Sequence, residues 1–172
     1  MPVPENYAAS ERLRDGRSVE IRMLRADDQD DMLAAIGRTS SQSLQRRFFG
    51  PKRSFSKKEV DFFMNIDFTS HVALIALADE DEHEVIIGGG RYVVTDSGMA
   101  EIAFVTIDDY QGLGVGTLLM RHLIILARTA GLEQLVADVL PENTAMRKVF
   151  AKFGFQERHG GDPQVICLAF PL

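Results

Sequence analysis

The sequence predicts a mixed α/β fold in which an antiparallel sheet is joined to a parallel crossover. Two observations support this class. Three apolar segments between residues 72 and 107 are joined by short turns, which is typical of an antiparallel meander. After Gly116 the apolar period changes from two to about 3.6 residues over a long segment, and another strand-like segment follows. A strand, a long helix and a second strand form a βαβ unit, whose two strands are parallel.

The chain length fits one domain. The protein has 172 residues, and a second independent core would be cramped in that length. Pro2 and Pro4, followed by the charged stretch 11–17, predict a flexible leader over residues 1–16. The single domain is therefore expected to span residues 17–172.

Composition excludes several functional classes. A single Cys cannot form an internal disulfide, which fits a reducing compartment. No segment offers about 18 uninterrupted apolar residues, and the N-terminus lacks the apolar region of a signal peptide. A cytoplasmic protein without membrane contact is expected. The formal charge of -6 argues against a nucleic-acid partner and is compatible with a cationic substrate.

The first third predicts one strand followed by helices. Apolar and polar residues alternate over 17–24, as in a half-buried strand. A helix through about Ile36 follows the acidic start at Asp27. Thr39 and Ser40 can cap a second helix, which Gly50-Pro51 would end, and Ser56 can begin a third.

The middle predicts the meander, with strands over 72–77, 84–95 and 99–107. Residues 88–90 are three consecutive glycines inside the second of these strands. Glycine within a strand usually marks a bulge or a close approach of another segment.

The last third predicts the crossover. A long helix begins near Val115 and ends at Gly131, with apolar residues on most of its circumference. A strand over 134–140, a helix from Asn143 to about Phe153 and a final strand over 165–170 complete the pattern.

The segment Gln111-Gly-Leu-Gly-Val-Gly-Thr117 lies between a predicted strand and the long helix. Its glycines allow a ligand to approach the backbone, and the unpaired N–H groups of a helix N-terminus favour an anion. The segment therefore predicts a cradle for a phosphate or pyrophosphate. A tightly packed glycine turn without a ligand is the alternative.

Two well-known phosphate motifs do not fit this segment. A dinucleotide fingerprint starting at Gly112 would need glycine where Thr117 stands. A P-loop would need a Lys before the Ser or Thr, and the segment contains none. Nucleoside-triphosphate chemistry is therefore not expected.

Several motifs, taken in order, resemble the GNAT family of N-acetyltransferases. The glycine segment resembles that family's acyl-CoA pyrophosphate motif. Residues 100–105 (AEIAFV) resemble its central strand, 137–143 (ADVLPEN) the next strand with its Asn-containing turn, and 152–155 (KFGF) its closing Gly-Phe. The resemblance implies a GNAT-type α/β fold with a mixed, mostly antiparallel sheet flanked by helices. It also implies acetyl-CoA as co-substrate and no metal.

Within that family the chain looks most like bacterial protein lysine acetyltransferase domains. The similar features are 21–28 (IRMLRADD), 43–49 (SLQRRFF) and Glu101 within AEIAF. This resemblance implies a protein lysine as the acceptor of the acetyl group, with a small-molecule amine as the alternative. A CoA-binding regulatory domain without catalysis is a third reading.

The candidate catalytic residue is Glu101. A carboxylate in the middle of an apolar strand is costly unless it is hydrogen-bonded, solvated or protonated, and burial raises its pKa toward that of a general base. The resemblance implies that Glu101 accepts the proton of the attacking amine in a ternary complex. The alternative is a structural Glu paired with Arg91 on the neighbouring strand.

The resemblance also implies the residues that hold acetyl-CoA. The glycine segment would bind the pyrophosphate through backbone N–H groups. The strand end would pair with the pantetheine amides, and Asn143 would contact the pantetheine arm, although it can also be a plain helix cap. The expected cofactor-binding residues are Phe104, Val105, Thr106, Gln111, Gly112, Leu113, Gly114, Val115, Gly116, Thr117 and Asn143.

One position departs from the family pattern. Many members carry a Tyr four residues before the closing Gly as a general acid, and Phe150 stands there in this chain. Of the remaining polar candidates, Arg46 and Arg47 are expected on a solvated helix face, with contact to the 3'-phosphate of CoA as the alternative. Cys167 is expected in the core. The four His residues lack the spacing of metal ligands. The sequence leaves the oligomeric state open, a homodimer included.

Overall fold

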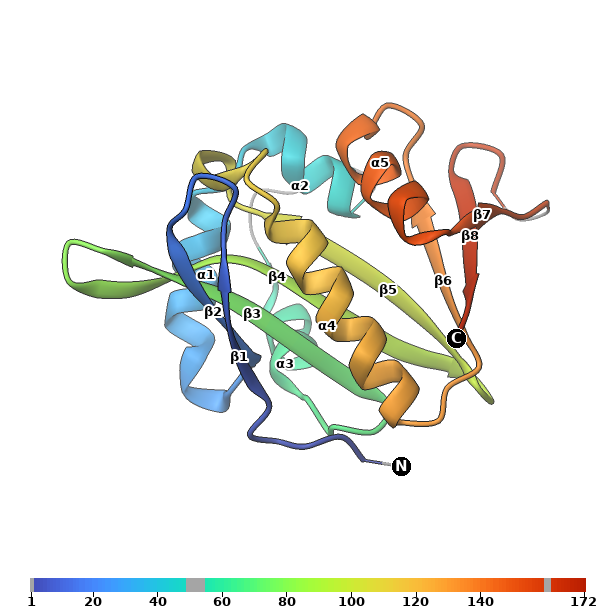
Figure 1. The fold of residues 1–172 in the computed structure, drawn as a ribbon, viewed down its shortest axis with the longest axis horizontal. Helices are drawn as coiled ribbons and strands as arrows, with labels where there is room; N and C mark the ends of the chain where they lie inside the picture. Colours follow the sequence, from blue (N-terminus) through green and yellow to red (C-terminus); the bar gives the residue numbers. More distant parts are fainter. Residues whose placement is uncertain (1, 49–54, 160–161) are drawn as a thin grey trace.

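A computed structural model describes residues 2–48, 55–159 and 162–172. In these ranges eight strands form one sheet in the order β1-β2-β3-β4-β5-β6-β8-β7 (Figure 1). Helix α4 (Val115–Thr129) crosses one face of the sheet, and α1 (Gln29–Gly37), α2 (Ser41–Phe48) and α3 (Lys57–Met64) cover the other. The mixed, mostly antiparallel class predicted from the sequence is confirmed.

The first half of the sheet is the predicted meander. Strands β2 (Ser18–Met23), β3 (His71–Glu80), β4 (His83–Asp96) and β5 (Met99–Thr106) pair as antiparallel neighbours. Two short helices lie at strand ends. η1 (Ala26–Asp28) stands where the sequence predicts the acidic first turn of a helix, and η2 (Asp108–Tyr110) was not predicted.

The helices on the far face begin at the predicted caps. Ser56 and Glu59 form a capping box at α3, because the Ser56 hydroxyl accepts the Glu59 N–H and the Glu59 carboxylate accepts the Ser56 N–H. The Ser40 hydroxyl accepts the N–H of Ser43 at the start of α2. The predicted end of α2 at Gly50-Pro51 lies outside the described residues.

The second half contains the predicted parallel crossover. Helix α4 connects β5 to β6 (Gln134–Val139), and these two strands pair in parallel. Their ladder covers only residues 99–101 and 134–136. On its other side β6 pairs along its whole length with β8 (Ile166–Pro171), and α5 (Thr144–Phe153) and the short strand β7 (Gln156–Glu157) follow β6 along the chain. The sheet is therefore split between the second half of β5 and β6.

The expected flexible leader over residues 1–16 is wrong. Residues 8–12 form strand β1 (Ala8–Arg12), which pairs with β2, and the side chains of Val3 and Leu13 are buried. The stretch lacks an apolar period because β1 is an edge strand, with alternating exposed and half-buried residues.

Polar side chains attach this N-terminal hairpin to α4. The Tyr7 hydroxyl lies 2.6 Å from Nδ1 of the buried His122, and Glu11 lies 3.1 Å from His122 Nε2. Arg121 donates to the same Glu11 carboxylate at 3.0 Å. The contacts join residues 110 to 115 positions apart in the chain.

The main core lies between the sheet and α4. Leu119, Leu123 and Leu126 on the predicted apolar stripe of α4 are at most 1% exposed. Phe150 on α5 belongs to the same apolar cluster, so α5 extends this layer beside α4. No helix of the described ranges is long and apolar enough to cross a bilayer.

The glycine run on β4 serves both faces of the sheet. A Cβ on Gly90 would lie 2.7 Å from Phe104 Cδ1 and 2.9 Å from Leu123 Cδ1, so the missing side chain lets α4 approach. A Cβ on Gly89 would lie in ordinary contact, 3.4 Å from the Leu74 carbonyl oxygen. The β3–β4 register also shifts beside Gly88, so both the predicted bulge and the predicted close approach are present.

Substituting Gly90 with Ala is therefore expected to destabilise the fold. The added methyl overpacks a buried contact, which lowers the free energy of unfolding by about 1–3 kcal/mol. Urea denaturation measures the change, with Gly89→Ala as the matched control one residue away. Equal stabilities for the two variants would contradict the packing of α4 described above.

Candidate active site

The glycine segment forms a loop that opens α4. Gly112 and Gly114 have φ values of 81° and 93°, which L side chains rarely adopt, and Gly114 is the N-cap of the helix. The N–H groups of the first helical turn have no partner within the helix. These N–H groups give the helix N-terminus a partial positive charge, which favours an anion beside the loop.

The Gln111 side chain ties this loop to two neighbouring elements. Its Nε2 donates to the Thr106 carbonyl at the end of β5 at 3.1 Å and to the Ser43 hydroxyl on α2 at 3.0 Å. The bonds hold the loop, the end of β5 and α2 together around one opening.

A pocket of about 450 Å³ occupies this opening. All but one of the residues expected to bind the cofactor line this pocket. The lining residues among them are Phe104, Val105, Thr106, Gln111, Gly112, Gly114, Val115, Gly116, Thr117 and Asn143. Leu113 is the exception, because its side chain packs against the apolar core. The sequence motif and the strand end are thus brought together in space.

Arg14 also lines this pocket, and the sequence gave no signal for it because it falls in the expected leader. Its backbone N–H donates to the Leu113 carbonyl at 3.0 Å, and its Nη1 donates to the Gly112 carbonyl at 3.3 Å. The turn of the N-terminal hairpin therefore places a cation on the glycine loop.

Three further cations line the same pocket from α2 and α5. Lys148 and Lys152 lie on α5, and Arg47 lies on α2. Arg47 is not on a solvated helix face, as the sequence suggested, but borders three neighbouring pockets. The chain is acidic overall, yet the charged side chains of this pocket are basic.

The split of the sheet leaves one edge of β5 open at the pocket. β4 pairs with β5 along its length, whereas the β6 ladder ends at Glu101. Residues 104–106 therefore present an edge uncovered by β6, and extended molecules bind such edges through backbone hydrogen bonds.

Glu101 lies where the two strands part. It borders a small pocket of about 60 Å³ with Arg47, Asp138 and Asn143. Partial burial and the nearby Asp138 raise the pKa of the Glu101 carboxyl, while Arg47 acts in the opposite direction. The residue is exposed, so solvent and a substrate can both reach the carboxylate.

Arg91 is not the partner of Glu101. The β4–β5 register places Arg91 opposite Ala103 and Val93 opposite Glu101. Arg91 Nη1 donates instead to the Phe63 carbonyl at 3.0 Å and to His71 Nε2 at 2.8 Å. Since Arg only donates, His71 Nε2 is the acceptor and the imidazole carries its proton on Nδ1.

Asn143, the N-cap of α5, and Phe150, in the second half of that helix, both line the Glu101 pocket. Asn143 Oδ1 accepts the Met146 N–H at 3.4 Å, so Asn143 is a helix cap whose buried side chain also lines the larger pocket. Phe150 is buried against Phe104 and Phe155. The apolar ring of Phe150 therefore occupies the position at which the family pattern has a Tyr as general acid.

Cys167 is half-buried beside Asp138 rather than in the core. A hydrogen bond with Asp138 raises the pKa of its thiol, which therefore stays protonated at neutral pH. Among the residues that the structure describes, no three His, Cys, Asp or Glu side chains gather as a metal site requires.

Stability is expected to fall between pH 6.5 and pH 4 because of His71. Burial and the neighbouring Arg91 lower the pKa of His71 to about 4, against the attraction of Asp67. In the unfolded chain a His titrates near 6.5, so the unfolded state binds more protons in this range, and acidification costs about 1–3 kcal/mol. Urea denaturation of wild type and His71→Gln at several pH values tests this. The stability difference between them should shrink as the pH falls, and a constant difference would refute the assignment.

Comparison with known proteins identifies the family. The model of the acetyltransferase (GNAT) family matches residues 41–155. Acetyltransferase PA5475 of Pseudomonas aeruginosa is 38% identical over 146 residues, covering 84% of this chain and 78% of that protein. Acetyltransferase Pat of Mycolicibacterium smegmatis is 30% identical over 145 residues, covering 83% of this chain but only 43% of that longer protein.

Solved structures agree with this result. The crystal structure of the GNAT domain of S. lividans PAT superimposes with a TM-score of 0.88 at 32% identity, covering 96% of this chain and 97% of that one. Mycobacterium smegmatis RimJ in complex with CoA-disulfide has the same fold, with a TM-score of 0.68 at 18% identity, covering 99% and 90% of the two chains. The chain therefore belongs to the GNAT family, which uses acetyl-CoA, and is an N-acetyltransferase.

Proposed function

We propose that the protein transfers the acetyl group of acetyl-CoA to the side-chain amine of a protein lysine, with Glu101 as general base. The observation that carries this proposal is the position of Glu101. It is an exposed carboxylate of raised pKa at the split of the sheet, in a small pocket that shares Arg47 and Phe104 with the large pocket of the glycine loop.

The residues of the large pocket fit CoA. The glycine loop offers N–H groups at a helix N-terminus, and Arg14, Lys148 and Lys152 add positive charge for a polyanion. The open edge of β5 at Phe104–Thr106 suits the amides of an extended pantetheine arm. When bound, acetyl-CoA supplies an activated acyl thioester.

Glu101 would supply the proton acceptor for the reaction. A lysine amine is mostly protonated at neutral pH and must lose a proton before it can attack. Glu101 takes this proton, directly or through one water, before the attack and releases it to solvent. The neutral amine then attacks the thioester carbon, and Glu101 takes the second amine proton as the new C–N bond forms and the C–S bond breaks. A backbone N–H at the end of β5 polarises the carbonyl oxygen.

The departing thiolate takes its proton from solvent in this proposal. Phe150 occupies the position of the family's general acid and has no proton to give. A thiol is a tolerable leaving group because its pKa is near 8.5. One residue, Glu101, therefore carries the acid–base chemistry.

The shape of the Glu101 pocket favours a protein lysine over a small amine. The pocket of about 60 Å³ is too small to enclose a whole polyamine or sugar amine, and Glu101 opens to solvent. A lysine on a protein surface has a long, flexible side chain that reaches such a site without being enclosed.

Substituting Glu101 with Gln is expected to lower the rate of acetyl transfer about 10²- to 10⁴-fold, because the variant keeps the shape but loses the proton acceptor. Radiolabelled acetyl-CoA is offered with a panel of proteins and, separately, of small amines, and CoA affinity is measured in parallel. Label in protein lysines supports the proposal, and label only in small amines favours the alternative acceptor. CoA binding without any transfer would identify a regulatory domain.

The matched control is Asp138→Asn. Removing this charge lowers the pKa of Glu101, so the acidic limb of the kcat/KM profile should move to lower pH. If Glu101→Gln matched wild type across pH 6 to 9, the base would have to be another group.

Substituting Arg14 with Gln is expected to weaken CoA binding roughly threefold to tenfold, because an exposed cation near a phosphate contributes a modest attraction. Calorimetry gives the affinities for CoA and for acetylpantetheine, which lacks the nucleotide phosphates and should bind both proteins alike. Arg12→Gln is the control, since Arg12 lies on the same hairpin but donates to the Gly16 carbonyl and is not among the described residues that line the pocket. An equal loss in both variants would rule out a direct role for Arg14.

A further inference from the structure

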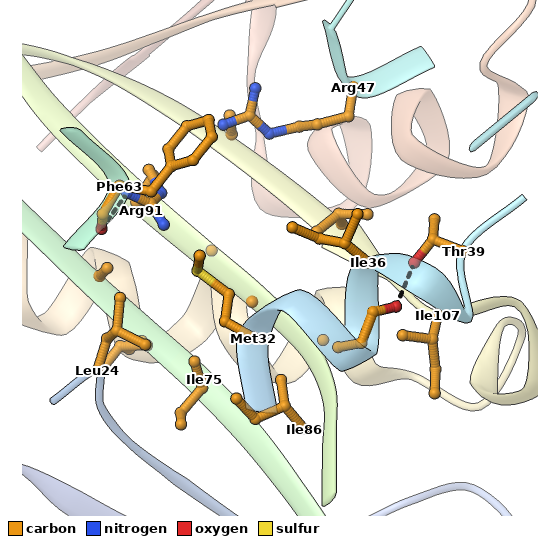
Figure 2. Close-up of a pocket in the computed structure, with 18 of the residues that line it drawn as sticks. Leu24, Met32, Ile36, Thr39, Arg47, Phe63, Ile75, Ile86, Arg91 and Ile107 are labelled. Carbon is orange, nitrogen blue, oxygen red and sulfur yellow. Dashed lines mark hydrogen bonds between the residues drawn. The ribbon is translucent and has the colours of Figure 1, made fainter. Parts of the chain in front are cut away.

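A second pocket lies on the face of the sheet opposite α4, between α1–α3 and strands β3–β5. Its volume is about 80 Å³, and Figure 2 shows its apolar walls, which include Leu24, Met32, Ile36, Ile75, Ile86 and Ile107. The Thr39 hydroxyl on the wall is satisfied by the Ala35 carbonyl at 2.9 Å. Two cations, Arg47 and Arg91, complete the lining.

Small residues account for the open space. Gly89 on β4, Ala103 on β5 and Ala73 on β3 belong to the lining. A Cβ on Gly89 would meet nothing closer than 3.4 Å, and the residue does not have a positive φ, so a larger residue could stand there. The backbone therefore does not require glycine at this position.

The pocket adjoins the reaction site. Ala103 and Val105 follow Glu101 at alternate positions of β5, so the three side chains share one face of the sheet. Ala103 also lines the Glu101 pocket, and Val105 also lines the large cofactor pocket. A group attached to either reactant is therefore close enough to enter.

Arg91 is held rigidly at one end of this pocket. It lies directly opposite Ala103 in the ladder, and its guanidinium stacks over the Phe63 ring at 4.9 Å (Figure 2). Its two hydrogen-bond acceptors, the Phe63 carbonyl and His71 Nε2, are neutral and occupy only Nη1. Within the described ranges, no carboxylate forms an ion pair with Arg91.

A cation in such a place favours an anion. Burial and the nearby Arg47 lower the pKa of Arg91 to about 9, so the guanidinium remains charged at neutral pH but is poorly compensated. Nε and Nη2 are still available as donors, and a planar guanidinium pairs best with a carboxylate.

We propose that this pocket binds a short aliphatic chain that ends in a carboxylate, with Arg91 as the ionic partner. An apolar cavity of about 150 Å³ accepts benzene, so the 80 Å³ available here suits roughly three carbon atoms. The chain is part of the acyl group of the donor or part of the acceptor amine. The inference rests on the proposed acetyl-CoA site and adds a selectivity for the reacting groups.

The first arm of the test asks whether the acyl donor carries the carboxylate. Succinyl-CoA and butyryl-CoA have acyl groups of equal length that differ in the terminal group, carboxylate or methyl. Calorimetry should show at least tenfold tighter binding of succinyl-CoA to the wild type. Arg91→Gln should abolish this preference while acetyl-CoA still binds.

Filling the pocket provides an independent variant. Gly89→Val should weaken the binding of succinyl-CoA and butyryl-CoA about fourfold for each methylene that is displaced, and leave acetyl-CoA binding within twofold. Gly89→Ala, which adds one methyl, is the milder control. If Arg91→Gln fails to fold, the proposal is still tested by Gly89→Val and by comparing succinyl-CoA with butyryl-CoA on the wild type.

The second arm asks whether the acceptor carries the carboxylate. With acetyl-CoA as donor, 4-aminobutanoate is compared with its carboxamide, and the KM should be at least tenfold lower for the acid in wild type only. A preference in either arm that Arg91→Gln removes supports the proposal.

The proposal is overturned if both carboxylate probes behave like their neutral partners, or if Arg91→Gln leaves a preference intact. CoA and acetyl-CoA serve as reference ligands in the same titrations. If they fail to bind, the proposed cofactor site itself is wrong. If they bind and the carboxylate preference is missing, only the selectivity pocket is refuted.

Discussion

The site depends on the short parallel ladder between β5 and β6. Only residues 99–101 of β5 pair with β6, so the strands separate after Glu101. Past this point the backbone groups on this edge of β5 are not bonded by β6, so a ligand can form hydrogen bonds with them. Glu101 lies at the point of separation. Helix α4 stabilises the opening because its apolar stripe packs against the sheet while its N-terminal loop borders the gap. A longer ladder would close the pocket and cover the carboxylate.

The large pocket is lined by basic side chains although the protein has a net negative charge. The protein is acidic, yet Arg47 borders three neighbouring pockets and lies near enough to Glu101 to influence its pKa. Partial burial and Asp138 shift the pKa of Glu101 in the opposite direction. Asp138 and Arg47 carry opposite charges and therefore shift the pKa of the Glu101 carboxyl in opposite directions. Substituting either neighbour would change that pKa.

The sequence predicted the elements that have strong local signals. The period of the apolar residues predicted α4, and the glycines predicted the loop over 111–117. Both elements lie at the expected positions in the chain. β1 was missed because its stability comes from distant contacts such as Glu11 with His122. Arg14 was missed for the same reason, since only the folded chain brings it to the glycine loop. Arg91 was named as a possible partner of Glu101, but the strand register places it opposite Ala103. Local patterns cannot encode such pairings.

The attachment of the N-terminal hairpin to α4 has a consequence for the order of events during synthesis. Residues of the N-terminal hairpin bond to the Gly112 and Leu113 carbonyls and to His122, which are synthesised about a hundred residues after the hairpin. Contacts of such long sequence separation form late, because loop closure must precede them. The glycine loop therefore acquires its final shape only after the segment that forms α4 has been synthesised. A nascent fragment that ends before α4 contains the hairpin of β1 and β2 but lacks the helix to which the hairpin attaches.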